Sequence, residues 1–316
     1  MKSSAKYGLK LLFSLLIFGL ALSQVDWMQV RGTLLAASGV WLALHVGSLV
    51  LERMVFTWKW LILIHVFDRS IGFARLLANT LIGKLWGTFL PSSLGVDVVR
   101  AYYLNRDVNN PGQVTASVLC DKLLALVALI LMALLGLWQC PPELQHAAFR
   151  VALIGGAGLV VLLVYACVNK LAAHWGSKLL ANIGLTFISQ FVQRVSAAMQ
   201  TYRGVPTVLL WSFLGSCALQ LVRVLSVWFM AIALGLELPF SFLLLVVPLS
   251  MILIMLPLSI GGIGLREGIF VGMFSLVGLA PSDGFALGLA TTLTDLLLSL
   301  AGGIVYLRVT RDSTAQ

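Results

Sequence analysis

The sequence has few charged residues, and few of these are acidic. Of its 316 residues, 10% are charged, and 12 acidic residues stand against 21 basic ones; an ordinary soluble domain has about 25% charged residues. Hydrophobic residues make up 60% and the mean hydropathy is +1.00. A soluble chain of this size would lack the polar residues to cover its surface, so lipid is the solvent for most of it. The composition excludes a soluble enzyme and a nucleic-acid-binding protein, and the formal charge of +9 fits basic loops beside anionic headgroups.

Motifs for metals and cofactors are also missing. The four cysteines lie far apart without a CxxC pair and give neither a metal site nor a disulfide framework. The chain has no Walker motif, no GxGxxG followed by an acidic ribose-binding residue, no HExxH and no GxSxG. We therefore expect no cofactor, no metal and no enzymatic activity. The isolated His45 and His65 are interpreted as packed or hydrogen-bonded side chains rather than ligands.

Apolar runs long enough to cross a bilayer core of about 30 Å are abundant. They predict an all-α polytopic membrane protein, in which residues 1–316 form one membrane domain with about six full spans. Three lysines precede the first apolar run, so this segment is either a cleaved signal peptide or a retained first span, and we prefer the retained span. The spans are predicted near 8–25, 32–52, 113–138, 149–169, 206–235 and 284–307.

Two more regions, Val55 to Leu94 and Phe240 to Leu279, are apolar but are interrupted by prolines, glycines and, in the first, charges. Each is interpreted as a pair of half-spans hinged at a Pro/Gly segment. Together with six full spans, these regions predict two re-entrant helical hairpins of opposite polarity.

Lysine and arginine are concentrated near residues 2–10, 53–75, 170–203 and 308–311, and cytoplasmic loops are the ones enriched in these residues. The distribution predicts a multi-pass protein of the cytoplasmic (inner) membrane with both termini in the cytoplasm. Apolar residues in the linker 170–205 have the spacing of an amphipathic helix on the cytoplasmic surface.

The two interrupted regions share a pattern. Pro-x-Ser-[Leu/Ile]-Gly-x4-Arg begins at Pro91 and again at Pro257, and Ala-[Ser/Thr]-x-Leu-x-Asp-x-Leu-Leu-x-Leu begins at Ala116 and again at Ala290. We therefore predict that 55–138 and 240–307 are inverted repeats whose hairpin tips enclose a polar cavity near mid-membrane, as in transporters built from such repeats.

Candidate site residues follow from the shared pattern. Helix N-termini after Gly95 and Gly264 would offer N–H groups to a phosphate. The alternative for Arg100 and Arg266 is that they extend to lipid headgroups at the hairpin mouths. The predicted lipid-phosphate ligands are Arg100, Arg266, Arg223 and Lys84, and the predicted hinge residues are Pro91, Gly95, Pro257, Gly261, Gly262 and Gly264.

Four carboxylates are predicted to act as coupling groups or in ion pairs, since an unpaired charge within a span is costly. An ion pair such as Asp121 with Arg223 would hold helices together. Asp97 and Glu267 flank the motif arginines and would orient them or carry protons. For Asp295 a structural pair and a proton-coupling role are both open.

The segments 89–104 and 256–268 resemble the two signatures of the flippase-like transmembrane family of lysylphosphatidylglycerol synthase. Members with a soluble synthase domain make an aminoacylated lipid and move it across the bilayer. Few residues follow the last predicted span, so the resemblance implies translocation without synthesis.

The predicted function is translocation of an anionic or phosphate-containing lipid, or a lipid-linked precursor, between leaflets. Its expected partner is a membrane phospholipid or a polyprenyl-type lipid. The alternative is a non-transporting membrane subunit that presents lipid to a lipid- or glycolipid-pathway enzyme or regulates that enzyme. A membrane transferase is disfavoured because no nucleophile and base are visibly paired.

Overall fold

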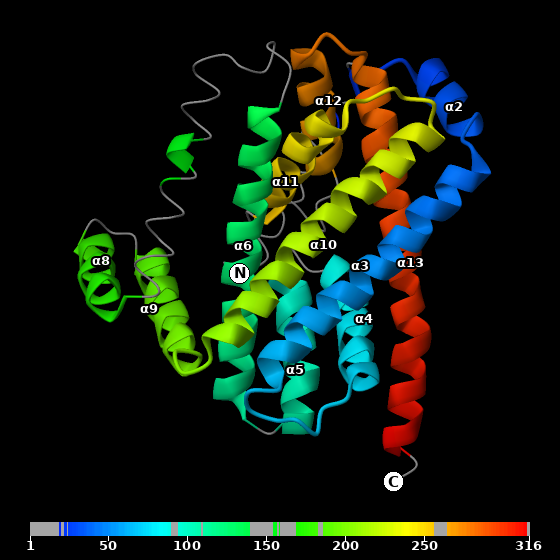
Figure 1. The fold of residues 1–316 in the computed structure, drawn as a ribbon. Helices are drawn as coiled ribbons and strands as arrows, with labels where there is room; N and C mark the ends of the chain where they lie inside the picture. Colours follow the sequence, from blue (N-terminus) through cyan, green and yellow to red (C-terminus); the bar gives the residue numbers. More distant parts are fainter. Residues whose placement is uncertain are drawn as a thin grey trace, which may run out of the picture.

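The computed structural model describes residues 22–23, 25–89, 94–108, 110–139, 169–182, 186–255 and 264–314, with short pieces at 19, 154–156 and 158. Within these residues all regular structure is helical, which confirms the all-α fold (Figure 1). The helices, in chain order, are α2 (Trp27–Leu35), α3 (Gly39–Ile64), α4 (Phe73–Phe89), α5 (Leu94–Val108), α6 (Pro111–Trp138), α8 (Lys170–Asn182), α9 (Thr186–Thr201), α10 (Pro206–Ala233), α11 (Phe240–Met255), α12 (Leu265–Leu276) and α13 (Pro281–Thr314).

Four of these helices are long and apolar enough to cross a bilayer: α3, α6, α10 and the Pro281–Leu307 part of α13. Three of them, α6, α10 and α13, match predicted spans closely. A continuous apolar run of this length is long enough to cross the bilayer as one helix, which makes such spans easy to predict. The predicted spans 8–25 and 149–169 lie largely outside the described residues.

The predicted span 32–52 is wrong in its bounds. Asp26 caps α2 by accepting hydrogen bonds from the N–H groups of Met28 and Gln29, and α2 then ends at Leu35. The N–H of Ser38 donates to the carbonyl of Ala233 at 2.8 Å, which ties the start of α3 to the end of α10. The helix then continues to Ile64, so its second half holds residues that the sequence assigned to a loop and a hairpin.

Two helical hairpins enter from opposite ends of the molecule. In Figure 1, α4 and α5 occupy the lower half and α11 and α12 the upper half, with their inner ends at mid-height. The first hairpin begins at Phe73 rather than Val55, because residues 55–64 belong to α3. Whether 55–138 and 240–307 superpose as an inverted repeat stays a prediction.

The two helices of the first hairpin pack closely. A Cβ atom on Gly87 would overlap the backbone of Val96, so only glycine permits this approach of α4 to α5. At the hairpin mouth Arg75 donates to both carboxylate oxygens of Asp107, with distances of 3.0 and 2.7 Å. The two helices of this hairpin are therefore held to each other by close packing at Gly87 and by a bidentate ion pair at the mouth.

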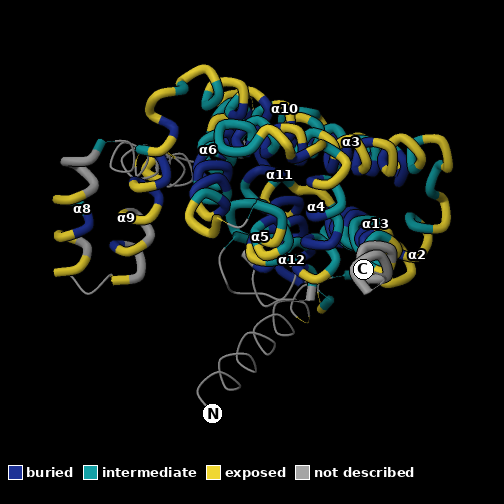
Figure 2. The backbone as a smooth tube through the Cα atoms, turned by 90° about the horizontal axis from the view of Figure 1, so that it is seen from below, coloured by how far each residue is buried: buried dark blue, intermediate teal, exposed yellow. Residues whose placement is uncertain are grey.

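The predicted amphipathic linker consists of two antiparallel helices, α8 and α9. Val195 and Tyr202 are fully buried against Leu63 of α3 and Cys120 of α6, and the Tyr202 hydroxyl donates to the Leu63 carbonyl at 3.2 Å. In Figure 2, α9 lies beside α6 while α8 stands farther out and shows mainly exposed residues among those coloured. Trp175 of α8 is 63% exposed, as expected for a surface that faces headgroups.

Candidate functional site

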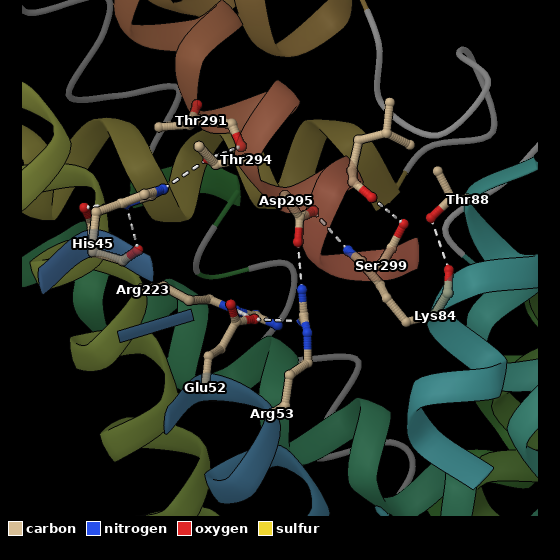
Figure 3. A network of polar contacts seen from close by, with 12 residues as sticks. His45, Glu52, Arg53, Lys84, Thr88, Arg223, Thr291, Thr294, Asp295 and Ser299 are labelled. Carbon is tan, nitrogen blue, oxygen red and sulfur yellow. Dashed lines mark hydrogen bonds and ion pairs between the residues drawn. The ribbon is translucent and has the colours of Figure 1, made fainter. Parts of the chain in front are cut away.

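A chain of ion pairs crosses the centre of the molecule. Glu52 accepts from Arg223 of α10 at 2.8 Å and lies 3.3 Å from Arg53. Asp295 of α13 pairs with Arg53 and, at 2.7 Å, with Lys84 of α4. Figure 3 shows Glu52 and Arg53 of α3 between Arg223 on one side and Asp295 on the other. Three bases and two acids thus connect four helices.

His45 lies about two turns earlier on α3, and both of its ring nitrogens have hydrogen-bond partners. Its Nδ1 lies 2.8 Å from the Ser226 carbonyl oxygen and its Nε2 lies 2.8 Å from the Thr294 hydroxyl (Figure 3). His65 Nε2 lies 3.0 Å from the Ile71 carbonyl oxygen. Both histidines are hydrogen-bonded as predicted, and the described residues contain no group of three His, Cys, Asp or Glu side chains placed to hold a metal.

A second ion-pair cluster lies where α3, α5 and α6 meet. Asp121 pairs with Lys59 and, at 2.9 Å, with Arg100, while Asp97 lies 2.9 Å from Arg100 and 2.6 Å from Lys122. The predicted pairing of Asp121 with Arg223 is therefore wrong. Arg223 lies on the far side of the ion-pair chain, where Glu52 is its partner.

Arg100 is fully buried beneath this cluster. Its guanidinium carbon lies 4.6 Å from the centre of the Phe56 ring and 4.3 Å from that of Trp60. Its Nε and Nη1 have no hydrogen-bond partner among the described residues, so the aromatic faces take the place of acceptors. The geometry suits a residue that positions Asp97 and Asp121.

Arg266, at the corresponding place in the second shared segment, has other surroundings. It forms no ion pair with any described residue. Its neighbour Glu267 is fully buried and accepts from the Gly264 N–H at 2.7 Å and the Thr292 hydroxyl at 2.6 Å. Glu267 therefore caps α12 and takes one of the N–H groups that the sequence offered to a phosphate.

Glycine is required at the start of α12, because Gly264 has a φ of 82°. Gly95, the second residue of α5, is buried. The other predicted hinge residues, Pro91, Pro257, Gly261 and Gly262, lie outside the described residues.

Two adjoining cavities lie between the hairpins. The smaller, of about 90 Å³, extends toward His45, Ser226 and Thr291; the larger, of about 190 Å³, extends toward Asp97 and Asp121. Both hairpins line the larger one, through Gly87, Thr88 and Val96 on one side and Ile254, Met255 and Arg266 on the other. The residues common to both cavities are Lys84, Arg223, Met251, Arg266 and Asp295.

Sequence reasoning identified most of this wall but missed the residues of α3. Arg53 and Lys59 were assigned to the cytoplasmic side and Glu52 was given no role, yet Glu52, Arg53 and Lys59 are 6%, 9% and 0% exposed. A helical repeat was available as a signal, since the residues at 45, 49, 52, 56, 59 and 63 fall on one face. Of the predicted ligands, Lys84, Arg223 and Arg266 lie together at the cavities, whereas Arg100 is not among the described residues that line them.

Fold and site together define a polytopic α-helical membrane protein with charged cavities between two helical hairpins. The chain belongs to the family described as the lysylphosphatidylglycerol synthase TM region, whose model matches residues 8–303. This confirms the resemblance seen in the two signatures. A UPF0104 membrane protein of Methanothermobacter thermautotrophicus is 25% identical over 301 residues, and the match covers 85% of this chain and 84% of that relative. No solved structure gives a significant match.

Proposed function

We propose that the chain moves a lipid with an anionic, phosphate-containing headgroup between the two leaflets, while the acyl or prenyl tails stay in the bilayer. The observation that carries the proposal is the wall of Lys84, Arg223 and Arg266, which is shared by two cavities, one lined also by His45 and Thr291 and the other by Asp97 and Asp121. Cationic side chains at membrane depth are costly without a counterion. A phosphate group supplies one, and arginine can bind it with two donors.

The ion-pair chain offers a way to pass the headgroup from one cavity to the other. Asp295 competes with an incoming phosphate for the same partners, Arg53 and Lys84. A headgroup that displaces this carboxylate on one side can be released on the other side when the carboxylate returns. The oppositely directed hairpins would then close the two cavities alternately, which is the arrangement of transporters with inverted repeats. The proposal assigns no chemical reaction to the chain.

We also propose that the end bearing the α4–α5 mouth faces the cytoplasm of a bacterial-type inner membrane. Exposed arginines gather in the connections and helix ends there, as at Arg69, Arg75, Arg106 and Arg203. Basic residues favour the cytoplasmic side. The α8–α9 pair would lie on that surface, beside the headgroups, where a lipid-pathway enzyme is a suitable partner.

The test is a leaflet assay on the full chain reconstituted in phosphatidylcholine liposomes. Fluorescent phosphatidylglycerol in the inner leaflet becomes accessible to a membrane-impermeant reductant only after it has moved outward. We expect movement well above that in empty liposomes, a loss with Arg266→Gln, and no loss with Arg69→Gln, which removes the same charge far from the cavities. Lipid binding without movement would support the alternative of a non-transporting subunit and overturn the proposal.

A further inference from the structure

The cavities are surrounded by more positive than negative charge. Seven basic side chains line them or contact the acids that line them, against four acidic ones, which leaves a formal excess of three positive charges. The bases are Arg53, Lys59, Lys84, Arg100, Lys122, Arg223 and Arg266, and the acids are Glu52, Asp97, Asp121 and Asp295. A bound counterion is the way to balance such an excess inside a bilayer.

The existing ion pairs show where the excess lies. Asp97 and Asp121 are already shared among the bases of the second cluster, and Glu52 and Asp295 among three bases of the central chain. Glu267 is occupied by Gly264 and Thr292. Each of the two clusters thus keeps one base in excess. The third excess base is Arg266, which forms no ion pair with a described residue and lies at the wall common to both cavities.

A second donor without a partner lies in the larger cavity. The Gln220 side chain is 1% exposed, and its oxygen accepts from Arg223 at 3.3 Å. Its Nε2 has no hydrogen-bond partner among the described residues. A buried amide without an acceptor is costly, so this group, like Arg266, fits an oxygen-rich ligand.

We infer that the headgroup carried by this site has two negative charges on its phosphate, as a terminal phosphomonoester does. This inference rests on the proposed function and narrows its substrate. A phosphodiester such as phosphatidylglycerol brings one negative charge and would leave two bases unbalanced, one more than a phosphomonoester leaves. An aminoacylated headgroup would add positive charge to a site that already has too much.

The experiment compares two lipids that differ by one methyl group. The full chain is placed in phosphatidylcholine nanodiscs, and binding of phosphatidic acid and of phosphatidylmethanol with identical tails is measured by native mass spectrometry at pH 8. At this pH a phosphomonoester, with a second pKa of about 6, carries nearly two charges, and its methyl ester carries one. We expect phosphatidic acid to bind at least about tenfold more tightly, because a second charge-assisted contact is gained.

The variants locate the preference. Arg266→Gln should reduce the ratio between the two affinities toward one, whereas Arg69→Gln should leave it unchanged. Equal binding of the two lipids by the unmodified chain would overturn the inference and leave the proposed function standing. If neither lipid bound better than phosphatidylcholine, the proposed function would fall as well.

Discussion

Asp121 and Asp295 are held in the same way, each by one base from α3 and one from the first hairpin. Asp121 on α6 pairs with Lys59 and Arg100, and Asp295 on α13 pairs with Arg53 and Lys84. The two carboxylates are the matched aspartates of the shared sequence pattern. Helix α3 and the first hairpin therefore act as a common scaffold for both.

The first prediction concerns unequal loss of stability at the Lys84–Asp295 pair. Asp295→Asn should destabilise the chain by about 3 kcal/mol, because removing one partner of a buried pair leaves buried charges unbalanced. Lys84→Met should cost about 1 kcal/mol, within the lower range for a net hydrogen bond, since Asp295 keeps Arg53. Thermal unfolding in detergent measures both, and a larger effect of Lys84→Met would show that Arg53 does not hold the carboxylate.

Spans and site residues differ in how far a sequence predicts them. The spans at 111–138 and 206–233 follow from apolar length alone, and a one-dimensional property suffices for them. The start of α3 depends on the hydrogen bond from Ser38 to Ala233, which joins residues 195 positions apart. No local pattern reports such a contact.

Ion-pair partners were the least predictable feature. The shared pattern identified Asp121 and Asp295 as a related pair, but neither of their α3 partners belongs to that pattern. Partner choice depends on which helix faces lie together, and this is settled by tertiary packing. The helical periodicity of α3 would have placed Lys59 on the same face as Glu52, yet it would not have chosen Asp121 as its partner.

The second prediction tests the close approach within the first hairpin. Gly87→Ala should destabilise the chain, by about 1–3 kcal/mol as for an overpacked site, because the added Cβ overlaps Val96. Gly272→Ala in α12 is the matched control, since no atom lies within 4 Å of its added Cβ. That change should be neutral or stabilising by up to about 1 kcal/mol. Similar unfolding temperatures for both variants would contradict the packing of α4 on α5.

The third prediction concerns orientation. Lys178 in α8 and Glu237 between α10 and α11 are both exposed, and the proposed topology places them on opposite sides of the membrane. On a cysteine-free background, an impermeant thiol reagent added to intact cells should label Glu237→Cys and leave Lys178→Cys unlabelled until the cells are opened. The buried Ser177 is unsuitable for this purpose, because it is 1% exposed. Labelling of Lys178→Cys in intact cells would reverse the proposed topology.

The last prediction separates the roles of the two motif arginines. Arg100 is enclosed by Phe56 and Trp60 and bound to two carboxylates, so Arg100→Lys should lower stability by about 1–3 kcal/mol, through lost aromatic and charged contacts. The affinity for anionic lipid should stay within about twofold, which is under 0.5 kcal/mol on the scale of 1.4 kcal/mol per tenfold.

Arg266 has no acidic partner among the described residues and borders both cavities, so Arg266→Lys should unfold at the parent temperature. Its lipid affinity should fall about tenfold, because lysine cannot bind a phosphate with two parallel donors. Unfolding curves and lipid titrations on the same two preparations measure both properties. If Arg100→Lys lost affinity without losing stability, the first motif arginine would belong to the binding site and its burial would be a feature of one state of the transport cycle.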